Sequence, residues 1–258
     1  MCLIFWLTVK TTGIVADSFR VARMLLSRIE DESTGHIKIP ELHGDPIPEW
    51  VIEKLGKSAS LLGKRGVCEA VPLTEPSVQL IDNDLLQLLL NKTWRPTLTV
   101  TGAEGLPAIA QAGNVLRPKT ALKVSIRLPP HVVPSVAEKA VLKTITENVP
   151  YNAQVEIRNV HTGSGWKCND FSKWLMDAME TGCKDFFGPY EPAFMGEGGS
   201  IPLMKILGDC YPKAQMLITG VAGPGSNAHG PNEHLNLNFC KKVICGVSKI
   251  LESHATSF

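Results

Sequence analysis

The feature that most restricts the fold of this 258-residue chain is the strict alternation of apolar and polar residues in ALKVSIRL, residues 121–128. Alternation places every second side chain on the same face, so it predicts a strand with one buried and one solvated face. PTLTVTG (96–102) and QVEIRNV (154–160) repeat the pattern. Strands of this kind need a second layer to cover their apolar face.

Two helices are predicted to provide that layer. Ser135 and Glu138 have the spacing of a capping box for a helix that runs to about Asn148, so strand, helix and strand over 120–160 predict a crossover unit. Residues 14–30 predict an amphipathic helix, with Gly35 as its stop signal. Its predicted apolar face contains Phe19, Ala22, Leu26 and Ile29. The expected fold over about 10–160 is a two-layer α/β sandwich, with helices on one face of a sheet.

Two other parts of the chain have different patterns. Residues 37–84 are interrupted by prolines and predict an elaborated connection, with short helices at EWVIEKL and NDLLQLLLNK. After residue 162, strand and helix alternate, which is typical of a layered α/β domain. The predicted elements there are a helix capped by Asn169 and closed by Gly188, a strand AFM, a turn GEGGS, a helix from Ser200, a strand QMLIT, and a last helix with Phe239, Val243, Ile244, Val247 and Leu251 at core spacing. With only two strands, this part is expected to be a portion of a larger sheet.

Composition and charge exclude several classes of protein. The formal net charge is +1, which gives no electrostatic footprint for nucleic acid or an anionic membrane. No apolar run approaches the roughly 20 residues that cross a bilayer. MCLIFWLTV at the amino terminus lacks a basic region and a cleavage site, so a buried strand, or an end foreign to the fold, is favoured over a signal sequence. Seven scattered cysteines indicate a reducing, cytoplasmic compartment.

A few residues have patterns that could carry chemistry. His229 lies in the loop AGPGSNAHGPNE (222–233), where a lone histidine is either a surface residue or a ligand. The turn EGGS can receive an anionic or carbonyl oxygen, or Ser200 can be a simple helix cap. Arg127 can clamp a carboxylate, or belong to a solvated strand face. His43 and Asp45 form a His-x-Asp pair, but no further ligands follow to make a metal site.

The carboxyl-terminal motifs resemble one known family. GEGGSIP followed about 30 residues later by NAHGPNE resembles the signature of the dizinc metallopeptidases related to carnosine dipeptidase, aminoacylase and acetylornithine deacetylase. GNVLRP, VSIRLPP and GIVADSFRVARMLLSRIE resemble parts of the lid domain that is inserted in that family. The resemblance covers nearly everything from Gly13 onward. It implies a lid and dimerisation domain over 10–162, followed by the carboxyl-terminal part of the catalytic domain over 163–258.

The resemblance also implies roles for individual residues. His229 corresponds to a ligand of one of two metals, Zn²⁺ or Mn²⁺, which activate a water that attacks a peptide or amide carbonyl. Arg127 corresponds to the lid arginine that binds the substrate carboxylate, and Asn114 to a polar lid contact. Gly199 and Ser200 correspond to the turn that contacts the substrate backbone. The implied substrate is a small peptide or an N-acyl amino acid, and the implied assembly is a homodimer formed through the lid.

The departures from the family pattern are as informative as the matches. No His-x-Asp ligand pair, bridging Asp, adjacent Glu-Glu or further acidic ligand is identified where the family's amino-terminal catalytic half would carry them, and LTVKTTG replaces the lid's His-Ser-Gly. One histidine cannot hold zinc, which takes about four ligands. We therefore expect the distal half of a peptidase, without catalytic residues of its own and inactive alone. The alternative is a non-catalytic dimerisation or regulatory module derived from such a peptidase. A serine hydrolase is excluded because no G-x-S-x-G elbow exists.

Overall fold

The computed structural model describes residues 2–6, 13–68, 78–196, 202–223 and 225–257. The described residues form two compact units. The first takes its residues from Met1–Ile47, Leu90–Trp166 and Glu197–Pro202, and the second from Pro48–Leu89, Lys167–Gly196 and Leu203–Phe258. The chain thus passes into the second unit at residue 48, returns at 90, and leaves again at 167. The assignment of 10–162 to a lid and 163–258 to a catalytic part stays a prediction.

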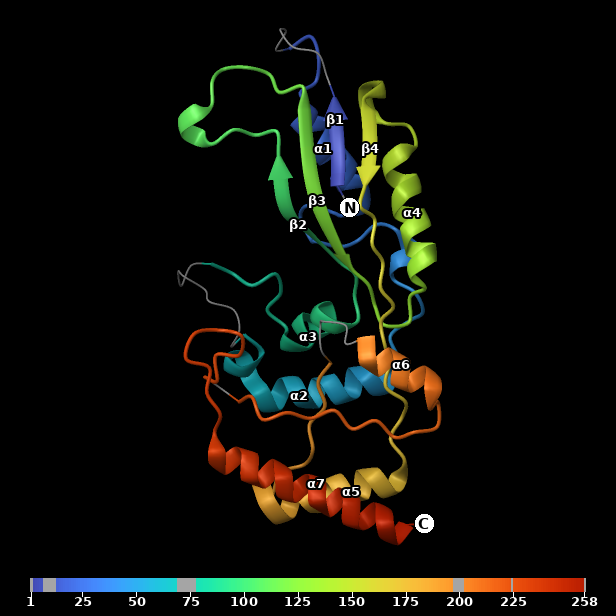
Figure 1. The fold of residues 1–258 in the computed structure, drawn as a ribbon, viewed down its shortest axis with the longest axis vertical. Coiled ribbons are helices and arrows are strands. Elements are labelled where there is room, and N and C mark those ends of the chain that lie inside the picture. Colours follow the sequence, from blue (N-terminus) through green and yellow to red (C-terminus); the bar gives the residue numbers. More distant parts are fainter. Residues whose placement is uncertain (1, 7–12, 69–77, 197–201, 224, 258) are drawn as a thin grey trace. The chain divides into compact units, whose positions relative to one another are not determined.

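The first unit contains a four-stranded sheet with the order β2-β3-β1-β4 (Figure 1). Its strands are β1 (Cys2–Trp6), β2 (Thr97–Glu104), β3 (Lys119–Arg127) and β4 (Gln154–Arg158). Every neighbouring pair is antiparallel. The strand predicted at the amino terminus is formed, and it lies between β3 and β4. These two strands therefore run parallel, as a crossover requires, but β1 separates them.

Two helices, α1 (Ser18–Ile29) and α4 (Pro134–Thr146), share one hydrophobic core with this sheet. In β3 the predicted alternation is confirmed, because Leu122 and Val124 are buried while Lys123, Ser125 and Arg127 are exposed. The buried face of α1 differs from the prediction. Val21 and Leu25 are fully buried, whereas Phe19 is 37% exposed. The predicted and the observed buried faces of α1 share Ala22 and Ile29, so periodicity alone could not choose between the two faces.

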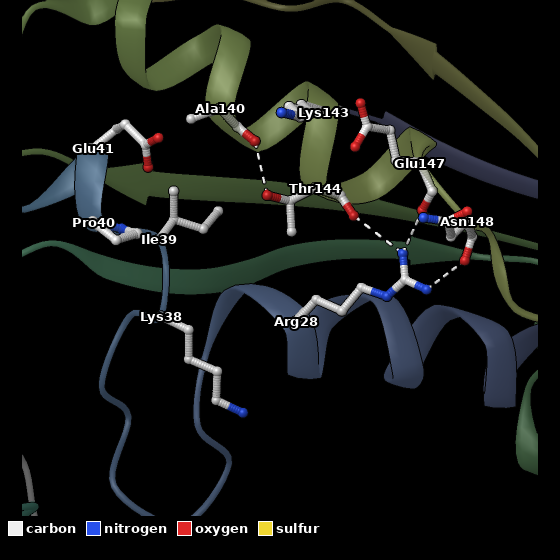
Figure 2. A pocket seen from close by; sticks show the side chains of 10 residues that line it. All are labelled: Arg28, Lys38, Ile39, Pro40, Glu41, Ala140, Lys143, Thr144, Glu147 and Asn148. Carbon is white, nitrogen blue, oxygen red and sulfur yellow. Dashed lines mark hydrogen bonds between the residues drawn. The ribbon is translucent and has the colours of Figure 1, made fainter.

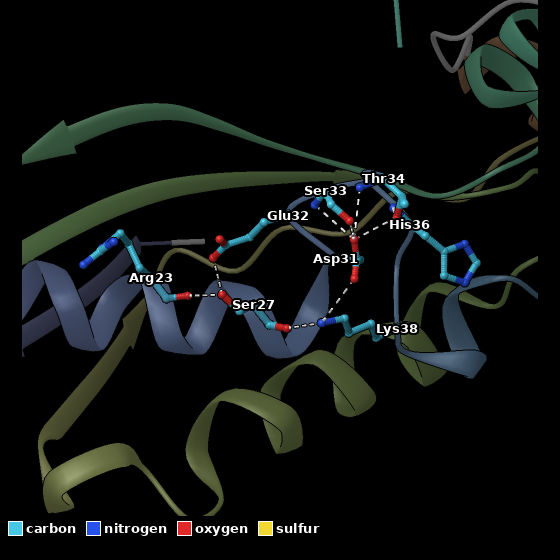
Figure 3. A network of polar contacts seen from close by, with 8 residues as sticks. All are labelled: Arg23, Ser27, Asp31, Glu32, Ser33, Thr34, His36 and Lys38. Atoms are coloured by element: carbon cyan, nitrogen blue, oxygen red, sulfur yellow. Dashed lines mark hydrogen bonds and ion pairs between the residues drawn. The ribbon is translucent and has the colours of Figure 1, made fainter. Parts of the chain in front are cut away.

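A turn after α1 returns the chain towards the core. Glu30 and Ile37 form an isolated bridge, and Gly35 adopts a left-handed φ of 72° at the predicted stop. Asp31 organises the turn, because its Oδ1 accepts hydrogen bonds from the backbone N–H and the hydroxyl of both Ser33 and Thr34 (Figure 3). These hydrogen bonds, that of the Ser33 hydroxyl first, lower the pKa of the Asp31 carboxyl to about 2.

The two ends of α4 are stabilised in ways that the sequence pattern did not predict. The capping box is wrong: the helix begins at Pro134 with Val133 as its N-cap and no side-chain cap, since proline at the first position needs no N–H partner. At the other end, the Arg28 guanidinium of α1 donates to the carbonyl oxygens of Thr144, Glu147 and Asn148 (Figure 2). Thr144 belongs to the last turn of α4, whose carbonyl groups have no partner within the helix, and Glu147 and Asn148 follow that turn.

The second unit is built from helices among the residues that are described. They are α2 (Glu49–Val67), α3 (Leu85–Thr93), α5 (Lys173–Phe187), α6 (Pro202–Cys210) and α7 (Leu237–Ser257). The residues of α3 from Leu90 on, and Pro202 of α6, are assigned to the first unit. Short 3₁₀ turns are η1 (Pro40–Leu42), η2 (Ile109–Gln111) and η3 (Pro150–Asn152), all in the first unit. α2 is longer than the predicted EWVIEKL segment and is interrupted at Gly63, which has a φ of 59°.

Helices α5 and α7 pack against each other in opposite directions. Phe187 at the end of α5 contacts Phe239 near the start of α7, with ring centroids 5.9 Å apart. Trp174 near the start of α5 contacts His254 near the end of α7, at 5.3 Å. The predicted core spacing of α7 is confirmed only in part. Phe239, Val243 and Val247 are half-buried, whereas Ile244 and Leu251 are 58% and 65% exposed.

A second set of predictions for this unit is wrong. AFM (193–195) and QMLIT (215–219) are not strands, and within the part of the chain that is described the second unit has no sheet. A strand requires a neighbour that pairs with its N–H and C=O groups, and these segments have none there. Asn169 does not cap α5, which begins at Lys173 with Ser172 as N-cap; its Nδ2 donates instead to the carbonyl oxygen of Pro212 at 2.9 Å.

None of the helices that the structure describes combines the length and the apolar character needed to cross a bilayer.

Candidate functional site

The loop that contains His229 is folded on itself through backbone hydrogen bonds. Ser226 forms its base: the Ser226 N–H donates to the Gly223 carbonyl and the His234 N–H donates to the Ser226 carbonyl, both at 3.0 Å. The Ser226 hydroxyl accepts the Gly223 N–H at 2.9 Å, and Ser226 is only 5% exposed. His229 itself is exposed, at the tip of this closed loop.

Side chains on both sides of His229 complete the loop. Before it, Asn227 Nδ2 donates to the Pro231 carbonyl at 2.6 Å. After it, the Glu233 carboxylate accepts the backbone N–H of His229 at 3.2 Å. The sequence analysis missed both residues, although a glutamate four residues after a candidate ligand, in a loop rich in glycine and proline, was the available signal.

The predicted lid residues lie in the first unit. Arg127 is the last residue of β3, is exposed, and pairs with Thr97 in the sheet. Asn114 is also exposed and lies in the connection between β2 and β3. This connection leaves from the end of the hairpin opposite Arg127 (Figure 1). Nine residues of β3 separate the two ends, which is about 27 Å at the usual strand rise.

The structure does not place all predicted site residues in one described pocket. Arg127 and Asn114 belong to the first unit and His229 to the second. Gly199 and Ser200 lie outside the described residues. Their predicted roles therefore stay predictions. A described cavity of about 470 Å³ contains none of these residues (Figure 2). It is lined around the Arg28 contacts by Lys38, Ile39, Pro40, Glu41, Ala140, Lys143, Thr144, Glu147 and Asn148.

The metal chemistry of the described residues is limited. Over the ranges that the structure describes, no three His, Cys, Asp or Glu residues are grouped so that they could hold a metal ion. His229 can supply one ligand, and a zinc site needs about four. The residues that are described therefore do not fit a complete metal centre.

The His-x-Asp pair at residues 43 and 45 has structural partners. His43 Nε2 forms a hydrogen bond with the Ile37 carbonyl at 2.7 Å, and its ring stacks on that of His36 with centroids 4.9 Å apart. The Asp45 carbonyl oxygen lies 3.1 Å from Nε2 of His131. These contacts hold the segment before α2.

Comparisons with known proteins identify relatives on the basis of sequence. The chain is 31% identical over 150 residues to the cysteinylglycine-S-conjugate dipeptidase of Corynebacterium striatum, and this alignment covers 55% of this chain and 31% of the relative. It is 29% identical over 236 residues to the Cys-Gly metallodipeptidase of Saccharomyces cerevisiae, covering 88% of this chain and 46% of the relative. It is 26% identical over 237 residues to the Beta-Ala-His dipeptidase of Rattus norvegicus, covering 87% of this chain and 44% of the relative. No family model matches the chain.

Solved structures share the fold. Human carnosine dipeptidase 1 matches with a TM-score of 0.68 and 20% identity, over 98% of this chain and 54% of that structure. An M20 family metallo-carboxypeptidase from Sulfolobus solfataricus matches with a TM-score of 0.72 and 17% identity, over 97% and 57%. The chain thus spans about half the length of the proteins that it matches most extensively. It has a mixed α/β fold that corresponds to part of these structures, and it is a homologue of the metallodipeptidases of the M20 family.

Proposed function

We propose that this chain corresponds to the lid domain and the carboxyl-terminal part of the catalytic domain of an M20 metallodipeptidase, and that it does not hydrolyse peptides by itself. The observation that carries the proposal is the coverage: the relatives match 87–88% of this chain, yet the chain matches only 44–46% of them. Among the described residues, no three His, Cys, Asp or Glu side chains are grouped so that they could hold a metal ion. Zn²⁺ or Mn²⁺, when bound in a complete enzyme, would activate the attacking water.

The proposed substrates are dipeptides or related N-acyl amino acids. This class is supported by the names of the relatives, which act on Cys-Gly and Beta-Ala-His. Arg127 would bind the substrate carboxylate, since its planar guanidinium can donate two parallel hydrogen bonds. Gly199 and Ser200 would contact the substrate backbone. We also propose a cytoplasmic location, with which the free thiols of Cys68, Cys168, Cys183, Cys210, Cys240 and Cys245 agree.

The proposed assembly is a homodimer formed through the lid. Asn114 lies in the connection that enters β3 at Lys119, and Arg127 is at the other end of that strand, which is about 27 Å long. We infer that a small substrate does not contact both residues of one chain. In a dimer, Asn114 of one copy could reach the substrate that Arg127 of the other copy binds, which makes both contacts possible.

The proposal is tested by assaying the purified 258-residue chain. With Cys-Gly or Beta-Ala-His as substrate and added Zn²⁺ or Mn²⁺, we expect no hydrolysis above the rate without protein. The His229→Ala variant is the matched control for contaminating peptidase. Turnover by the chain that disappears in His229→Ala would contradict the proposal, because it would show a complete active centre.

The second candidate is a non-catalytic dimerisation or regulatory module. It is favoured by the sheet, whose outer strands β2 and β4 each have one edge without a partner strand among the described residues. Sedimentation velocity at micromolar concentration should show a dimer. A monomer would count against the lid assignment in both candidate functions, whereas a dimer that changes the activity of an added full-length relative would favour the regulatory module.

A further inference from the structure

The backbone around His229 has a conformation that needs support. His229 has a φ of 64°, and Asn227 and Asn232 have φ values of 52° and 58°. The left-handed region is uncommon for residues other than glycine, and three such residues within six positions are kept there only when their surroundings specify it. The contacts that provide this support can be named.

Two side chains bridge the loop on either side of His229. The Glu233 carboxylate holds the His229 N–H at 3.2 Å, and the Asn227 amide holds the Pro231 carbonyl at 2.6 Å. Asn227 also packs against Gly230, where an added Cβ would lie 2.6 Å from Nδ2 and 2.7 Å from Oδ1. The buried Ser226 fixes the base of the same loop. The backbone of His229 is therefore held on both sides by the side chains of Asn227 and Glu233, which we call the clamp. Neither side chain contacts the His229 imidazole in any contact that the structure describes.

We propose that Asn227 and Glu233 are positioning residues for His229: they hold its backbone in the left-handed conformation and so set the direction of its side chain before any ligand binds. The inference deepens the proposed function, on which it rests for the role of His229 as a ligand. The clamp itself requires neither a metal ion nor the rest of a peptidase, because all of its hydrogen bonds lie within 223–234.

The test measures amide hydrogen exchange of residues 225–234 by NMR in the 258-residue chain. In Glu233→Ala, exchange of the His229 amide should be about fivefold faster, as expected for the loss of one hydrogen bond. Glu233→Gln should restore the wild-type rate, because the glutamine side-chain oxygen can accept the same bond. Equal rates in wild type and Glu233→Ala would overturn the role of Glu233. An unchanged thermal midpoint in each variant shows that the fold is intact.

A double-mutant cycle tests Asn227. Gly230→Ala alone should shift the amide resonances of the whole loop, since the new methyl group overlaps the Asn227 amide. Adding Asn227→Gly removes that overlap, so the combined effect should be smaller than the sum of the two single effects. Additive effects would overturn the packing role of Asn227. These measurements involve no turnover, so their failure is separate from a failure of the hydrolysis assay that tests the proposed function.

Discussion

Replacing Arg28 with alanine should lower the free energy of unfolding by about 2 kcal/mol, and the structure shows why. Arg28 projects from α1 to the carboxyl end of α4, where it donates to three backbone carbonyl oxygens (Figure 2). Helix α4 ends without a glycine cap: Glu147 is the C-cap in an extended conformation. The Arg28 guanidinium thus binds carbonyl groups at and just after the end of α4 and ties the two helices together.

The magnitude follows from the contacts. The bonds to Thr144, Glu147 and Asn148 measure 3.2, 2.7 and 2.5 Å, and only the first is partly buried. A hydrogen bond from a charged donor contributes roughly 1.5–3 kcal/mol when shielded from water, so we take about 1 kcal/mol for the partly buried bond and about 0.5 for each exposed one. Arg28→Lys should lose about half of the total, because an ammonium group cannot span three carbonyls in the plane of a guanidinium.

The assay is urea unfolding followed by circular dichroism, with Arg23→Ala as the matched control. Arg23 is on the same helix and exposed, and its guanidinium lies 5.8 Å from the centroid of the Phe19 ring. Its loss should therefore cost about 0.5 kcal/mol or less. The order of stability should be wild type, Arg28→Lys, then Arg28→Ala. If Arg28→Ala were no less stable than Arg23→Ala, the capping role of Arg28 would be refuted.

Three other predictions concern separate parts of the fold. Lys54→Met should lower the free energy of unfolding by about 1–2 kcal/mol, and Lys54→Arg by less. The Lys54 ammonium lies 4.8–5.6 Å from the centroids of three aromatic rings of the second unit. Thermal melts would measure this loss, and equal melting temperatures of Lys54→Met and wild type would contradict it. Gly105→Ala should lower the free energy of unfolding by about 1–3 kcal/mol, because Gly105 has a φ of 91° and an added Cβ would lie 2.2 Å from the Lys119 carbonyl oxygen. Gly113→Ala is the control: its added Cβ would meet only Val115, at 4.0 Å, so it should be nearly neutral in the same melts. The hydrogen bonds to Asp31 (Figure 3) hold its pKa at about 2, below the usual 3.8. The contribution of Asp31 to folding stability is therefore present above about pH 4 and is lost as the pH falls through 2. An NMR titration of Thr34→Ala should show a higher Asp31 pKa, and an unchanged pKa would refute the hydrogen-bond explanation.

Local sequence patterns predicted the first unit better than the second. The alternation in β3 predicted both its strand and which of its residues are buried, because a strand on a covered sheet has only two faces. Of the two helices beside it, α1 was predicted from its periodicity, and α4 from a capping box that the structure does not contain. In the second unit, QMLIT has the composition of a strand but forms no ladder within the described residues. Composition favours an extended backbone, whereas a ladder depends on a partner that is distant in sequence.

For the candidate site, too, one part was predicted from the sequence and another part depends on the structure. The motifs GEGGSIP and NAHGPNE, about 30 residues apart, were enough to indicate a relationship to metallodipeptidases, which the comparisons bear out, because a spaced set of residue types is a property of the sequence itself. The hydrogen bonds of Asn227 and Glu233 could not be predicted, since they depend on the path of the loop backbone, in which Asn227, His229 and Asn232 all adopt a positive φ.

The sequence by itself thus determined the strand β3 with its alternating burial, the presence of α1 and α4, and the relationship to metallodipeptidases, because these depend on which residues stand at which spacing. Only the tertiary structure decided that the amino-terminal strand lies between β3 and β4, that Val21 and Leu25 rather than Phe19 form the buried stripe of α1, and that Arg28 caps α4. Each of these depends on contacts between residues far apart in the chain. Such contacts are selected by the packing of the whole unit, where several locally acceptable arrangements compete and one buries the most apolar surface with its polar groups paired.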